Sequence, residues 1–182
     1  MMIHAYSEDY LNNAQKILGD MMDYAVNTYE FSPNQFYEMF LVSDVSMQFQ
    51  TGNPTYVAGK TGCELVKEVI RKSGLLIPEL EDEMYLDKSP EYWCGWALAY
   101  YQWYTGRSFM KIYHAVSIEE IFKYVSSLSR NGYFPDFVET INEKWDQYYV
   151  ETNLKRLRML SGLSQSELAK RSGVALRQIQ LF

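Results

Sequence analysis

The sequence predicts an all-α protein. Apolar residues recur every three or four positions along most of the 182-residue chain, which is the spacing of one helix face. Serine or threonine stands before most of these stretches, where a helix N-cap belongs. No segment keeps the alternation of a half-buried strand, and no internal repeat is evident. Apolar residues form 47% of the chain, so we expect a packed helical core rather than disorder.

Helix signals begin close to the N-terminus. Ser7 can cap a first helix. Ser32 followed by Pro33 gives a second helix its cap and its first-turn proline. Thr61 and Glu64 have the spacing of a capping box and begin a third helix. The apolar faces of these helices are, in order, Leu11, Ala14, Leu18, Met21 and Ala25; Phe36, Met39 and Phe40; and Leu65, Val66, Val69 and Ile70.

A polar connection with Pro78 and the acidic run 79–83 precedes the most aromatic segment, residues 92–104, which Ser89 and Pro90 cap. This segment is apolar nearly all round, so we interpret it as a central core helix, with an aromatic effector pocket as the alternative. The acidic run could bind a metal, or it could mimic DNA and bind the basic C-terminal segment. A solvated connection explains it better, and we assign it no role.

Two further helices complete an expected body of residues 1–150. Ser117 and Glu120 repeat the capping-box spacing, and their helix is expected to run to Gly132. Pro135 with Asp136 begins the next helix. The apolar faces of the two helices are Ile121, Phe122 and Val125, and Phe137, Ile141 and Trp145.

Charge is distributed unevenly along the chain. Residues 1–150 hold 11 basic and 21 acidic side chains, a net charge of −10, whereas residues 151–182 hold 6 and 2, a net charge of +4. Because nucleic acid attracts basic surfaces through its phosphates, a DNA-binding face is expected at the C-terminal end. We therefore predict an acidic helical domain over residues 1–150 and a DNA-binding domain over residues 151–182.

The C-terminal segment, residues 153–182, has the pattern of three short helices with tight turns. Gly162 ends the first helix and Ser164 caps the second. Ala169 is small enough for two helices to cross closely, and Gly173 can take the positive φ of the turn between them. The residues expected to fill the core that these helices share are Leu168, Val174 and Ile179.

This segment resembles the Xre/Cro family of phage-repressor-like helix-turn-helix domains, and the resemblance covers about a sixth of the chain. It implies a bacterial, sequence-specific transcriptional regulator that reads a two-part operator in double-stranded DNA. The positions that match the family pattern are Leu154, Leu157, Arg158, Gly162, Leu163, Ser164, Gln165, Glu167, Leu168, Ala169, Gly173, Val174 and Ile179.

The resemblance also implies which residues meet DNA. Gln165 would touch a phosphate and brace the recognition helix, and Arg177 is the best candidate for base reading because a guanidinium can grip guanine O6 and N7 together. Leu176 and Leu181 stand where relatives commonly have polar readers, so contacts with thymine methyls or with DNA shape are expected. The expected DNA-binding residues are Ser164, Gln165, Ala175, Leu176, Arg177, Gln178 and Leu181.

The family pattern continues past Phe182 with closing helices and with a glutamate that pairs with the arginine matching Arg158. Without them, we expect Arg158 to lack that partner and Leu157, Ile179 and Phe182 to lack part of their apolar cover. We therefore interpret the chain as a shortened form that binds DNA weakly or not at all, whereas a form extended past Phe182 binds well.

Three functions stay open at this point. In the first, the acidic domain dimerises or senses a ligand while the C-terminal domain binds operator DNA. In the second, the protein is an antitoxin whose residues 1–150 sequester a toxin and whose C-terminal domain represses its own operon. The third is a helical protein-interaction module with an incomplete DNA-binding domain. A plain helical hairpin is the alternative interpretation of residues 153–182.

Catalytic and metal-binding patterns are not recognisable in the sequence. Cys63 and Cys94 are too few for a zinc site, and His4 and His114 have no partner at ligand spacing. Residues 59–61, Gly-Lys-Thr, lack the earlier glycine and the strand of a phosphate-binding loop. We therefore expect no enzymatic activity, cofactor or metal. The lack of a signal peptide and of a long apolar run predicts a cytoplasmic protein without a membrane span.

Overall fold

The computed structural model of the chain describes residues 4–128 and 136–180. All regular elements in these two ranges are helical, so the predicted all-α class is confirmed. The chain divides into two compact units, unit 1 from Met1 to Val138 and unit 2 from Glu139 to Phe182. The sequence suggested a boundary between residues 150 and 151, and this position lies inside the continuous helix α8 (Phe137–Leu160).

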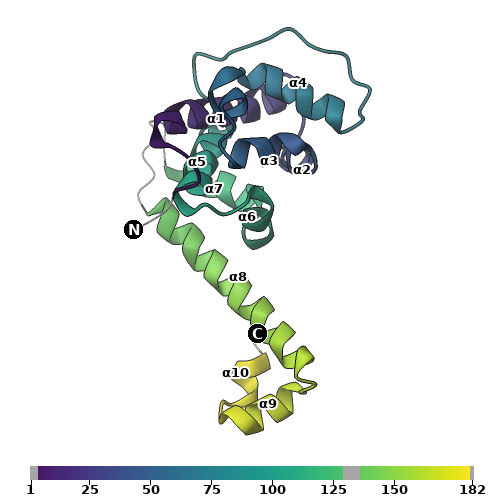
Figure 1. Ribbon diagram of the computed structural model, residues 1–182, viewed down its shortest axis with the longest axis vertical. Coiled ribbons are helices and arrows are strands. Elements are labelled where there is room, and N and C mark those ends of the chain that lie inside the picture. The colour runs from purple at the N-terminus through teal and green to yellow at the C-terminus, as the bar shows by residue number, and fades with distance from the viewer. Residues whose placement is uncertain (1–3, 129–135, 181–182) are drawn as a thin grey trace. The chain divides into compact units, whose positions relative to one another are not determined.

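Unit 1 is a cluster of helices joined mostly by short turns, with one long connection between α4 and α5 (Figure 1). Unit 2 consists of most of α8 and two short helices. The elements are η1 (Glu8–Tyr10), α1 (Leu11–Asn27), α2 (Pro33–Val42), α3 (Asp44–Gln50), the π-helical turn η2 (Thr55–Gly59), α4 (Gly62–Lys72), α5 (Pro90–Thr105), α6 (Phe109–Ala115), α7 (Ile118–Leu128), α8, α9 (Gln165–Ser172) and α10 (Leu176–Gln180).

The pairing of α1 with α5 forms the centre of unit 1. Gly95 of α5 lies so close to α1 that a Cβ there would overlap the Leu18 carbonyl oxygen and lie 2.8 Å from the Met22 Cγ. Leu98 and Tyr101 of α5 are fully buried. The interpretation of residues 92–104 as a core helix is therefore confirmed, because small residues let two helix backbones approach and large ones fill the space around them.

The caps of unit 1 follow the sequence closely. Ser32, Thr61 and Ser89 each accept a hydrogen bond from the backbone N–H three residues later. At Thr61 the bond is reciprocated, because the Glu64 carboxylate accepts the Thr61 N–H at 2.8 Å. These three expected caps are thus confirmed, whereas Ser7 caps the short turn η1 and not α1 itself. Such bonds join residues within one turn, which is why spacing alone predicts them.

Several elements differ from the expectation. The short elements α3, η2 and α6 were not predicted, because each is too brief to show a helical period. In unit 2, one helix, α8, runs through a stretch where two helices were expected. The expected positions Gly132 and Pro135 lie outside the described residues.

Candidate nucleic-acid interface

The start of α9 is fixed by a reciprocal cap. Gly162 takes a φ of 64° after the end of α8, which turns the chain toward α9. The Ser164 Oγ accepts the Glu167 N–H at 3.2 Å, and the Glu167 carboxylate accepts the Ser164 N–H at 2.8 Å. These bonds, first from the backbone and then from the hydroxyl of Ser164, lower the pKa of Glu167. The cap therefore keeps a carboxylate at the N-terminus of α9.

The turn between α9 and α10 is built around Gly173. This residue has a φ of 72°, a left-handed conformation that side chains with a Cβ rarely adopt, and its N–H donates to the Ala169 carbonyl at 3.0 Å. The Ser172 hydroxyl donates to the Leu168 carbonyl at 2.7 Å and accepts the Val174 N–H at 3.3 Å. Gly173 thus has the positive φ that the sequence assigned to it.

The structure brings most of the expected DNA-binding residues to one part of unit 2. Ser164 and Gln165 begin α9, and Gln165 is half-buried. Ala175 precedes α10 and its carbonyl accepts the Gln178 N–H at 2.9 Å. The described residues on or beside α10 that were expected to meet DNA are all exposed: Ala175, Leu176, Arg177 and Gln178. Leu181 lies outside the described residues.

Basic side chains lie on the same helices as the expected DNA-binding residues. Lys170 and Arg171 occupy the last turn of α9 and Arg177 lies on α10, and all three are exposed. Arg158, near the end of α8, donates through its Nη1 to the Leu163 carbonyl at 2.8 Å. The sequence predicted that Arg158 lacks the glutamate partner of the family pattern, and this bond to a backbone carbonyl gives it a local partner in the turn before α9.

An apolar hollow lies beside the two short helices. It measures about 250 Å³ and is lined by residues of α8, α9 and α10 with the turn between them. Ile179 is buried, with 6% of its surface exposed, but Val174 is 42% exposed and Leu157 is 56% exposed. Val174 therefore does not fill a shared core as the sequence suggested, because too few apolar side chains surround it. The lining residues are Leu154, Leu168, Ser172, Val174, Gln178 and Ile179.

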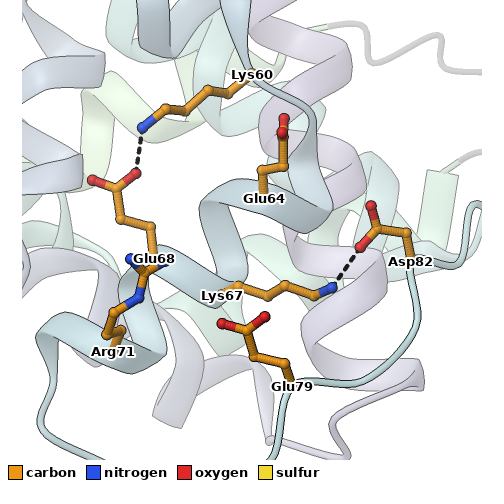
Figure 2. Close-up of a pocket in the computed structure, with 7 residues that line it drawn as sticks. All are labelled: Lys60, Glu64, Lys67, Glu68, Arg71, Glu79 and Asp82. Carbon is orange, nitrogen blue, oxygen red and sulfur yellow. Dashed lines mark hydrogen bonds and ion pairs between the residues drawn. The ribbon is translucent and has the colours of Figure 1, made fainter.

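Unit 1 holds a second candidate site, a charged pocket of about 390 Å³ between α4 and the α4–α5 connection (Figure 2). Sequence reasoning missed it, because its charged residues are spread over more than one element and no motif joins them. The acidic run of the connection takes part, since Asp82 pairs with Lys67 at 2.7 Å. The lining residues are Lys60, Glu64, Lys67, Glu68, Arg71, Glu79 and Asp82.

Other kinds of site find little support. Within residues 4–128 and 136–180, no group of His, Cys, Asp or Glu is arranged to hold a metal ion. In the same ranges no helix has the length and apolar character to cross a membrane. His4 stacks on Trp103 with ring centroids 3.9 Å apart, and Cys63 and Cys94 are buried and free. No protein family, curated protein or solved structure matches the chain.

Proposed function

We propose that the protein is a DNA-binding transcriptional regulator that contacts double-stranded DNA through α9, α10 and the turn between them. The observation that carries this proposal is the pair of short helices joined at the left-handed Gly173, with Lys170, Arg171 and Arg177 exposed around them. A tight turn of this kind presents a helix whose exposed side can enter the major groove. The resemblance to the Xre/Cro pattern supports the same function.

Charge supports the proposal independently of that resemblance. Residues 151–182 carry a net charge of +4, although the whole chain carries −6. Exposed arginine and lysine side chains gain free energy at phosphates by releasing counterions, whereas the acidic unit 1 is repelled. A DNA contact confined to unit 2 is the arrangement that this distribution favours.

Selection from a random duplex library, followed by fluorescence anisotropy with the enriched sequence, tests the proposal. We expect an enriched sequence whose affinity falls steeply with salt. Arg177→Ala should weaken binding by about 1–3 kcal/mol and relax the preference at one base pair. Lys16→Ala, at an exposed position of α1 in unit 1, is the control and should leave the affinity unchanged. A chain that enriches no sequence, or an Arg177→Ala variant with full affinity, would contradict the proposal.

A further inference from the structure

The charged pocket of unit 1 is held in place by bonds outside its own lining. The Tyr29 hydroxyl accepts the Leu80 N–H at 3.0 Å, and the Tyr24 hydroxyl donates to the Glu81 carbonyl at 2.8 Å. Lys88 pairs with Asp20 at 2.8 Å near the end of the α4–α5 connection. The part of the connection from Leu80 to Lys88 is therefore held against α1 and the residues that follow it, although it has no regular structure, and Glu79 directly precedes this part.

Most charges in the pocket are satisfied within the protein. Glu68 pairs with Lys60 at 2.5 Å and also accepts from the Tyr56 hydroxyl at 3.0 Å. Lys67 pairs with Asp82, and the Glu64 carboxylate is held by the Thr61 cap. Figure 2 shows the Lys60–Glu68 and Lys67–Asp82 pairs, marked by dashed lines, at two separate places around α4. These groups form the walls of the pocket rather than its free ligands.

Two opposite charges of the pocket make no direct bond. In the part of the chain that the structure describes, the Arg71 guanidinium and the Glu79 carboxylate have no side-chain hydrogen bond and no ion pair, with each other or with another residue. Glu79 acts on Lys67 at longer range, because the pKa of Lys67 is raised first by its hydrogen bond to Asp82 and to a smaller extent by the charge of Glu79. Arg71 comes from the last turn of α4 and Glu79 from the connection, and both line the same pocket. A ligand that has both a negative and a positive group can bind two oppositely charged side chains that line one pocket but do not form an ion pair.

We propose that this pocket binds a small zwitterion, with a ligand carboxylate on Arg71 and a ligand ammonium on Glu79. Arginine suits a carboxylate because its planar fork donates two parallel hydrogen bonds. A volume of about 390 Å³ lies in the usual range of small-molecule sites. An inorganic anion would face four carboxylates and a simple cation would face three basic side chains, so neither matches the lining as well. The proposal rests on unit 1 alone and is independent of DNA binding.

Calorimetric titration of the full chain with ω-amino acids of increasing length tests this proposal. Glycine, 4-aminobutanoate and 6-aminohexanoate are the probes, because the spacing of Arg71 and Glu79 selects one chain length. Butanoate and butylammonium are the singly charged controls. We expect at least one amino acid to bind at least tenfold more tightly than either control compound. The absence of binding by every amino acid, or equal binding of a singly charged compound, would overturn the proposal.

Two variants locate the ligand. Arg71→Met and Glu79→Gln are expected to reduce the affinity of the best probe at least tenfold each, while Lys16→Met, at an exposed position of α1, leaves it unchanged. Arg71 and Glu79 are both exposed, so the variants should fold, and circular dichroism checks that they do. Full affinity in both properly folded variants would place any binding elsewhere and overturn the assignment.

Discussion

The Glu68 carboxylate on α4 accepts hydrogen bonds from several side chains. Lys60 and Lys72 donate to it at 2.5 and 2.8 Å, and the Tyr56 hydroxyl donates at 3.0 Å. Burial by itself acts to raise the pKa of Glu68, but these three donors outweigh it and lower the pKa to about 2. Because the side chain is only 12% exposed, solvent screens these interactions weakly. Glu68 therefore ties η2 to the middle of α4.

Replacing Glu68 by glutamine should make the free energy of unfolding less dependent on pH in the acidic range. The ionised carboxylate stabilises the fold above its ordinary pKa of 4.5, and that contribution disappears as the pH falls toward 2. In urea titrations at pH 7 we expect Glu68→Gln to lower the free energy of unfolding by about 1–3 kcal/mol. The difference from the parent should shrink as the pH falls from 4.5 to 2.

The control for this measurement is Glu119→Gln, at an exposed position in the first turn of α7. Its unfolding curve should follow the parent at neutral pH, because exposed single charges contribute little to stability. A deficit for Glu68→Gln that stays constant down to pH 2 would show that the loss is steric rather than electrostatic.

At the scale of the elements, α1 and α5 pack closely because glycine lies where the two helices touch. Gly19 of α1 faces the Tyr92 ring, where a Cβ would lie 2.7 Å from the nearest ring carbon, and Gly95 of α5 faces the α1 backbone. A side chain at Gly95 meets a carbonyl oxygen, which cannot rotate away as a side chain can. The two helices therefore need a residue without a Cβ at this crossing.

Gly95→Ala is expected to destabilise unit 1, although alanine is the better helix former. The added methyl group must push the helices apart and loosen the core, which typically costs about 1–3 kcal/mol. Thermal unfolding followed by circular dichroism measures the effect. Ser126→Ala, on the exposed face of α7, should change stability by less than about 0.5 kcal/mol. An unchanged melting temperature for Gly95→Ala would mean that the helices lie farther apart than described.

At the scale of the whole molecule, the two units differ in how much apolar surface each buries. Unit 1 contains the fully buried Leu98, Tyr101, Phe36 and Phe49, whereas the buried residues among the described side chains of unit 2 are Ile141 and Ile179. Small units with little core are marginally stable, because burial must offset the entropy of ordering the chain. The helices that carry the proposed DNA contact are therefore expected to open more readily than the core of unit 1.

Hydrogen exchange measured residue by residue on the free chain should show this difference. Amides in the middle of α1 and α5 are expected to exchange only when unit 1 unfolds, and those of α9 and α10 several orders of magnitude faster. Adding the duplex selected above should slow exchange in α9 and α10 and leave α1 unchanged, because a ligand stabilises the conformation that it binds. Equal protection of both units in the free chain would contradict the prediction.

Local features of this protein could be read from its sequence to different extents. The caps at Thr61 and Ser164 and the turn at Gly173 were predicted, since each depends on residues within a few positions of one another. The exposure of Val174 was not, because burial depends on what the rest of the chain supplies. The DNA-binding roles of Gln165 and Arg177 stay predictions, with Arg177 exposed as a contact would require.

The sequence by itself determined the helical class, the main helices with their caps, and the concentration of basic charge after residue 150. These properties follow from periodicity, capping and composition, which are local or additive. Only the tertiary structure decided that α8 is one helix, that an acidic connection is fixed against α1, and that Arg71 and Glu79 share a pocket without pairing. Contacts between distant residues depend on how the whole core packs, and one-dimensional spacing does not contain that information.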